Sequence, residues 1–173
     1  MNLSRDWDYL VKVATLRLAS NKTPRHVSLF GSEIELIGAA GELAARRFLG
    51  IDEALGTTFD GGVDLEYAGR TIDVKATKMT PKLRYRYLQW PEWKPVKSDI
   101  ILLTAVDVLE KNATVVGFAL REEIKDGAVN YERDIPCYEI PILKLRSPWE
   151  LLALEQDQRR SPVQNLKEWL MAT

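Results

Sequence analysis

The 173-residue sequence predicts a single α/β (α+β) domain in which a mixed β-sheet of about four to five strands is flanked by helices. Three patterns predict this fold. Apolar residues recur at helical spacing over 32–49, apolar and polar residues alternate over 63–67 and 71–75, and continuous apolar runs span 99–108 and 113–120. The length suits one domain over 1–173, with its core at about 32–120 and helical additions at both ends.

The N-terminal addition is a helix predicted over residues 5–20, because apolar side chains recur there at helical spacing. Its stripe consists of Trp7, Leu10, Val11, Ala14 and Leu18. The segment after this helix contains His26, which has no companions at metal-ligand spacing. We therefore leave His26 out of the candidate site.

A stronger helix is predicted from Ser32, whose side chain forms a capping box with Glu35, to Gly50 at the far end. Its apolar face carries Ile34, Ile37, Gly41, Ala44, Ala45 and Phe48, and the small residues indicate close packing. Glu42 lies at the margin of this face, where a carboxylate can lean over the edge of a sheet. The alternative is a surface ion pair with Arg46, four residues further along.

A β-hairpin is predicted next, with a turn centred on Ala68-Gly69 that places Asp64 opposite Asp73. Alternation gives a packed face of Val63, Leu65, Tyr67, Ile72 and Val74, and a polar face of Asp64, Glu66, Thr71, Asp73 and Lys75. Opposed carboxylates repel each other unless a cation lies between them, so the polar face is a candidate metal site. The alternative is an exposed sheet face on which Lys75 is the compensating charge.

The segment 78–97 is locally basic, with six Lys or Arg residues against the single acid Glu92. The basic and aromatic side chains interleave, and the candidates for contact with nucleic acid are Lys78, Lys82, Arg84, Tyr85, Arg86, Tyr87, Trp90, Trp93 and Lys94. Pro81, Pro91 and Pro95 argue against a helix or a central strand. An aromatic-anchored loop folded over the core, or a dimer contact, is the alternative to a nucleic-acid-binding flap.

The C-terminal half adds two core strands and a helical end. The apolar runs 99–108 and 113–120 predict the strands, and Pro136 and Pro141 make 135–145 at best an irregular edge strand. Ser-Pro pairs at 147–148 and 161–162 predict the starts of two helices within 147–171.

Composition excludes several classes of protein. One cysteine and one histidine exclude a disulfide framework and a zinc finger, so any metal must be held by oxygen atoms. The formal charge of −1 means that contact with nucleic acid must come from a local patch. No apolar run approaches the length of a membrane helix and no signal peptide is recognisable, so we expect a cytoplasmic, intracellular protein without membrane contact.

The order of these features resembles the PD-(D/E)xK nuclease superfamily. Glu42, within GAAGELAARRFLG, resembles the acid of the first core helix, Val63-Asp64 stands in the place of the Pro-Asp pair, and Asp73-Val74-Lys75 matches the D/E-x-K triplet. The resemblance covers roughly residues 32–120. It implies a restriction-endonuclease-like fold, and the chain departs from the pattern at Val63, where the family name has proline.

The resemblance implies a Mg²⁺-dependent endonuclease that hydrolyses phosphodiester bonds, with DNA the favoured substrate and Mn²⁺ able to substitute. Asp64 and Asp73 would bind the metal directly, the Val74 carbonyl would be a third ligand, and Glu42 would bind directly or through water. Lys75 would orient or deprotonate the attacking, magnesium-activated water. Glu66, on the same face, lies towards the turn and outside this set.

Two other functions stay open from the sequence. One is a catalytically silent nuclease-like domain that binds nucleic acid or serves in assembly. The other is a metal-free interaction domain that uses the aromatic segment and the C-terminal helix in a homodimer. Cleavage of both strands of a duplex by an enzyme of this size would also favour a homodimer.

Overall fold

The structure is a computed structural model that describes residues 1–20, 31–57, 62–79 and 87–154. Its main elements, in chain order, are α1 (Trp7–Ser20), α2 (Gly31–Leu49), β1 (Leu65–Tyr67), β2 (Arg70–Lys78), β3 (Tyr87–Pro91), β4 (Ile100–Asp107), β5 (Asn112–Leu120), α3 (Arg121–Ile124), β6 (Ala128–Asn130) and β7 (Cys137–Pro141). Short 3-10 turns span Ser4–Asp6 and Ile142–Lys144, and residues 148–154 are helical. The rest of the predicted C-terminal helices, 155–171, lies outside the described residues.

The central sheet has the strand order β1-β2-β4-β5 and is mixed. The pairs β1/β2 and β4/β5 are antiparallel, whereas β2 and β4 are parallel. The sheet needs this crossover because the chain leaves it after β2, forms β3 elsewhere, and returns to begin β4 beside β2. The prediction of an α+β fold with a mixed sheet flanked by helices is confirmed.

A second, three-stranded sheet has the order β3-β7-β6 and was not predicted. The prediction of an edge strand near 135–145 is wrong, because β7 is the central strand of this sheet. Pro136 precedes β7 and Pro141 is its last residue, so neither proline interrupts the ladder. The prolines limit the strand's length and leave its position in the sheet unaffected.

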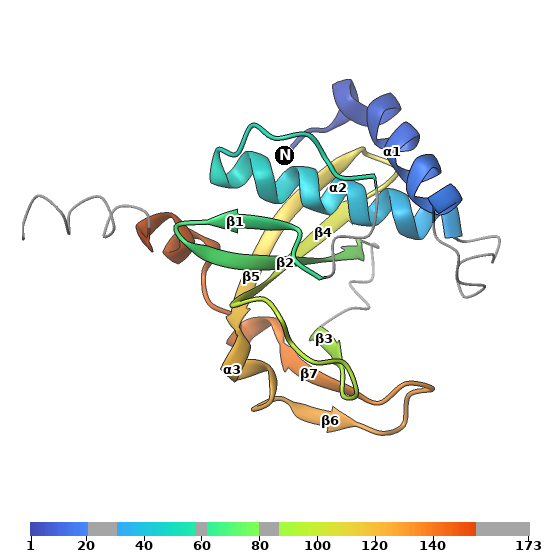
Figure 1. The fold of residues 1–173 in the computed structure, drawn as a ribbon. Coiled ribbons are helices and arrows are strands. Elements are labelled where there is room, and N and C mark those ends of the chain that lie inside the picture. The colour runs from blue at the N-terminus through green and yellow to red at the C-terminus, as the bar shows by residue number, and fades with distance from the viewer. Residues whose placement is uncertain (21–30, 58–61, 80–86, 155–173) are drawn as a thin grey trace, which may run out of the picture.

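The central sheet is covered on both faces (Figure 1). Alternate residues of β2 and β4, including Ile72, Val74, Ile100 and Leu102, pack in one cluster with Ala45 and Leu49 of α2. The residues between them on β4, Ile101 and Leu103, pack instead with Leu88 and Trp90 of the second sheet. The polar face of the predicted hairpin therefore points towards the second sheet.

The predicted faces of the two N-terminal helices are largely confirmed, but Ile34, predicted on the apolar face of α2, is exposed. On α1 the buried residues are Trp7, Leu10, Val13 and Ala14, and Val11 was assigned wrongly because its side chain is exposed. The second helix begins at Gly31, so Ser32 lies in its first turn instead of at the N-cap. Gly50 follows its last residue with φ of +71°, a left-handed conformation that glycine adopts without strain.

The β1/β2 hairpin has the predicted register, with Leu65 opposite Ile72 and Tyr67 opposite Arg70. Ala68 and Gly69 both have positive φ, as a two-residue type I′ turn requires. The ladder ends at the Leu65–Ile72 pair, so Asp64 lies just beyond the strand and is not a ladder partner of Asp73.

Among the described residues, no helix is long and apolar enough to cross a membrane.

Candidate active site at the edge of β2

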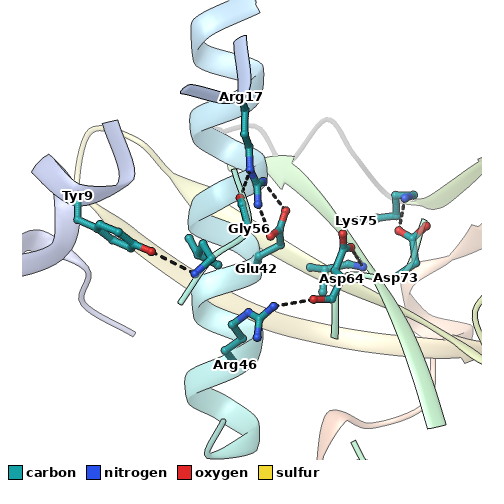
Figure 2. A network of polar contacts seen from close by, with 10 residues as sticks. Tyr9, Arg17, Glu42, Arg46, Gly56, Asp64, Asp73 and Lys75 are labelled. Atoms are coloured by element: carbon teal, nitrogen blue, oxygen red, sulfur yellow. Dashed lines mark hydrogen bonds and ion pairs between the residues drawn. The ribbon is translucent and has the colours of Figure 1, made fainter. Parts of the chain in front are cut away.

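Asp64 lies beside the part of β2 that carries Asp73 and Lys75 (Figure 2). The Val74 N–H donates a hydrogen bond of 2.6 Å to Oδ2 of Asp64, which fixes that carboxylate at the edge of β2. Asp73 is 2% exposed, and its Oδ1 accepts a hydrogen bond from the Lys75 ammonium. The alternative of an exposed polar face is therefore wrong at Asp73, which is buried, whereas Lys75 does pair with this carboxylate as that alternative predicted.

Glu42 is also buried, and both of its carboxylate oxygens are taken by Arg17 of α1. The two guanidinium nitrogens donate to Oε1 and Oε2 at 2.6 and 2.7 Å, as Figure 2 shows. The hydrogen-bonded Glu42 carboxylate raises the pKa of Arg17, although burial of the guanidinium opposes this, and the charge of Asp64 adds to the rise. The alternative of a surface pair between Glu42 and Arg46 is wrong.

Arg46 instead connects α2 to the chain that enters the hairpin. Its side chain is buried, with one terminal nitrogen donating to the Asp64 carbonyl at 2.6 Å and the other to Glu53 at 3.1 Å. Arg46 thus holds the backbone of Asp64, while the Val74 N–H holds its carboxylate. Sequence reasoning missed Arg17 and used Arg46 only as a surface partner, since nothing local distinguishes either from a solvated arginine.

Trp90, in β3 of the second sheet, packs beneath the side chains of Lys75 and Lys94. It is 2% exposed, and its Nε1 donates to the Lys94 carbonyl at 2.7 Å. The ammonium groups of Lys75 and Lys94 lie 4.9 and 4.8 Å from the centre of its ring, within range of cation–π attraction. Burial lowers the pKa of Lys94, and the charge of Lys75 lowers it further.

The remaining candidates for contact with nucleic acid are placed unevenly. Trp93 is 66% exposed and Tyr87 is partly exposed, whereas Trp90 is a core side chain that no base could reach. Lys78, at the end of β2, forms an ion pair with Glu33 of α2. Lys82, Arg84, Tyr85 and Arg86 lie outside the described residues.

The donor set suits a hard cation such as Mg²⁺ at the pair Asp64 and Asp73. Magnesium is commonly held by one or two carboxylates together with waters and substrate phosphates. Within the described ranges, no three Asp, Glu, His or Cys side chains are grouped so that they could hold a metal ion together. Glu42 has both oxygens bound to Arg17, so a metal ion would share or compete for this carboxylate with the guanidinium.

No protein-family model, curated protein or solved structure matches this chain. The resemblance to the PD-(D/E)xK nucleases therefore rests on the residues themselves and on their arrangement, and it is carried forward as a proposal.

Proposed function

We propose that this chain is a metal-dependent nuclease that hydrolyses phosphodiester bonds in nucleic acid, with DNA the favoured substrate. The observation that supports this most is that the Asp64 carboxylate is bound to the backbone of Val74, the residue between Asp73 and Lys75, which form an ion pair. Two carboxylates and a neighbouring ammonium are groups that metal-assisted hydrolysis of a phosphodiester can use.

Each residue of the candidate site has a defined role in the proposed reaction. Asp64 and Asp73, with the Val74 carbonyl, would hold Mg²⁺ or Mn²⁺. The ion, when bound, would supply positive charge to the phosphate oxygens as their negative charge grows. Lys75, released from Asp73, would then hold the attacking water or a phosphate oxygen through its ammonium group. Arg46 would keep Asp64 in place through the backbone.

The basic residues of 78–97 would bind the substrate backbone. Lys94 is suited to a phosphate because, among the described residues, its partly buried ammonium has the Trp90 ring beside it and no carboxylate partner within ion-pair distance. Lys78, at the end of β2, and Tyr87, at the start of β3, would extend this contact, as would the exposed Trp93 and Lys82, Arg84, Tyr85 and Arg86. Trp90 is not retained as a contact, since it is buried.

The proposal is tested by cleavage of plasmid, linear duplex, branched and single-stranded substrates with Mg²⁺, comparing wild type with Asp73→Asn and Lys75→Met. We expect each variant to lose at least about a hundredfold in rate, since each removes a charge at the reacting phosphate. Binding to the same substrates in EDTA should survive. The matched control is Lys125→Met, which removes an exposed lysine at the end of α3 and should leave the rate unchanged.

Undiminished cleavage by both site variants would contradict the proposal. A second candidate, a catalytically silent domain that binds nucleic acid, is favoured by one observation. Arg17 and Lys75 already neutralise Glu42 and Asp73, so the acids are stable in the fold without a metal. Binding of nucleic acid by the wild type with no cleavage under Mg²⁺ or Mn²⁺ would support this second candidate.

A further inference from the structure

One edge of β2 is open next to the candidate active site. β1 pairs with β2 only from Arg70 to Ile72, so beyond Ile72 this edge pairs with no described strand. The Ile72 carbonyl accepts the Asp64 N–H here, and the Val74 N–H donates to the Asp64 carboxylate. Main-chain groups of alternate strand residues point to the same side, so the N–H and C=O of Ala76 and Lys78 also face this edge.

A cleft of about 550 Å³ lies along this open edge. It runs between α2 and β3, which Figure 1 shows on opposite sides of the end of β2. Ile34, Ile37 and Gly38 line it from α2, and Tyr87, Leu88 and Gln89 line it from β3. The segment from Lys75 to Lys78 forms the wall between them. Apolar side chains of α2, of β3 and of Leu103 in β4 therefore line the cleft together with the polar Glu33 and Gln89, and the edge of β2 with its main-chain donors and acceptors lies between them.

We infer that this cleft binds one unpaired nucleobase of the nucleic acid, an inference that rests on the proposed nuclease function. A base lying in the plane of the sheet would present its hydrogen-bonding edge to the N–H and C=O of Ala76. Its two flat faces would contact the apolar walls, with the Tyr87 ring available for stacking. Lys75 lines the cleft and also contacts Asp73, so this base would belong to a nucleotide next to the reacting phosphate.

A peptide strand added to the same edge is less compatible with these dimensions. The Val74 N–H is already bound to Asp64, which leaves the Val74 carbonyl and the main-chain groups of Ala76 and Lys78 on this edge of β2. Strand addition normally pairs over about five residues. Lys75 and Lys78 bring two ammonium groups to the cleft, paired in this structure with Asp73 and Glu33, and a nucleotide phosphate would compete with these carboxylates for them. The volume lies within the usual range of small-molecule pockets.

The cleft can be filled without disturbing the fold. A Cβ built on Gly38 meets no atom within 4 Å, so Gly38→Leu would extend into the cleft without a backbone clash. Leucine also favours a helix more than glycine does. Gly38→Ala is the graded control, since it adds a single carbon to the same position. Tyr87→Ala removes the opposite wall and serves as an independent second variant.

The test follows the backbone amide signals of Ala76 and Lys78 by NMR in EDTA. Wild type is titrated with the four deoxynucleoside 5′-monophosphates and, separately, with 2-deoxyribose 5-phosphate, which lacks a base. We expect the nucleotides to shift both signals and the sugar phosphate to leave them unchanged. Gly38→Leu and Tyr87→Ala should weaken nucleotide binding by about tenfold or more, and Gly38→Ala by less.

Cleavage gives a second readout. Wild type should cut a single strand faster than the same sequence in a duplex, and Gly38→Leu should remove most of this preference. Equal response to nucleotide and sugar phosphate, or amide shifts with an extended peptide and none with nucleotides, would overturn the inference. Because the titration needs no cleavage, nucleotide binding by a wild type that never cuts would refute the proposed activity and support the base-binding cleft. Cleavage by a wild type whose amide signals do not distinguish nucleotides from the sugar phosphate would support the proposed activity and refute the base-binding cleft.

Discussion

Glu42 and Arg17 form a bidentate ion pair that is nearly shielded from water, with side chains only 10 and 13% exposed. Arg17 also donates from Nε to the Gly56 carbonyl, so one guanidinium joins α1, α2 and the loop that follows α2. A carboxylate buried to this degree is stable only with a counter-charge and hydrogen bonds. Arg17 supplies both to Glu42.

Replacing Arg17 with methionine should destabilise the protein by about 3 kcal/mol, because the Glu42 carboxylate is left buried without a partner. Urea unfolding at neutral pH measures this. The double variant Arg17→Met, Glu42→Gln is the control, and it should recover part of the loss since no unpaired charge remains. If the single variant were as stable as wild type, the ion pair would not contribute to the fold.

The same variant tests whether Glu42 can bind a cation. With Arg17 removed, both oxygens of Glu42 are available next to the proposed metal ligands. We expect millimolar Mg²⁺ to raise the thermal unfolding temperature of Arg17→Met more than that of wild type. An equal shift in the two proteins would place Glu42 outside the metal site and leave Asp64 and Asp73 as its acids.

Helix α2 approaches the sheet most closely at Gly41. A Cβ there would lie 2.6 Å from the Cβ of Ala76 and would also collide with Oγ1 of Thr104. Because Gly41 has no side chain, α2 can pack directly on β2 and β4. This packing also positions Glu42 and Arg46, which lie on the same helix, at the candidate site. Gly38, one turn earlier, faces the open cleft, and the two glycines of one helix therefore have different roles.

Gly41→Ala and Gly38→Ala form a matched pair of substitutions within α2. We expect Gly41→Ala to destabilise the protein by about 2–3 kcal/mol, because buried strand residues must move to admit the methyl group. Gly38→Ala should be neutral or stabilising by up to about 1 kcal/mol, since alanine is the better helix former. Thermal and urea unfolding of both variants measure this. Equal effects would show that α2 does not pack as closely on β2 as the contacts at Gly41 require.

In the molecule as a whole, helices cover one face of the central sheet and a second sheet lies on the other (Figure 1), and the candidate site includes residues of β2. Hydrogen bonds between Thr71 and Asp99 connect β2 and β4 at the start of their parallel pairing. The Thr71 N–H and hydroxyl donate to the Asp99 carboxylate at 3.0 and 2.9 Å. Arg121, at the start of α3, also pairs with this carboxylate at 2.7 Å. One acid thus links two strands and a helix.

These contacts of the Asp99 carboxylate predict that the free energy of unfolding decreases in acid. Hydrogen bonds from the Thr71 backbone and side chain, together with Arg121, hold the pKa of Asp99 below its usual range. The stabilisation is therefore fully present above about pH 4 and is lost as the pH falls through the lowered pKa of the folded state. Asp99→Asn should be less stable than wild type at pH 7, and the difference should shrink at about pH 3. A difference that is independent of pH in urea unfolding would contradict this.

Much of the candidate site was predictable because its signals are local. The period-2 alternation and the Ala68-Gly69 turn give the hairpin register, and that register brings Asp64 near Asp73 and Lys75. The second sheet was not predictable in the same way, since β3 and β7 are 45 residues or more apart in the chain and contain prolines. Their pairing depends on how distant segments meet.

The sequence by itself therefore determines the α+β class, the packed and polar faces of the hairpin, and a helix with Glu42 at the margin of its apolar face. Those properties follow from backbone periodicity and turn chemistry, which act over a few residues. Only the tertiary structure decides that Arg17 pairs with Glu42, that Trp90 is buried beneath two lysines, and that the edge of β2 opens into a cleft. These depend on which surfaces pack together, and a charge or an aromatic ring acquires its role only from neighbours distant in the chain.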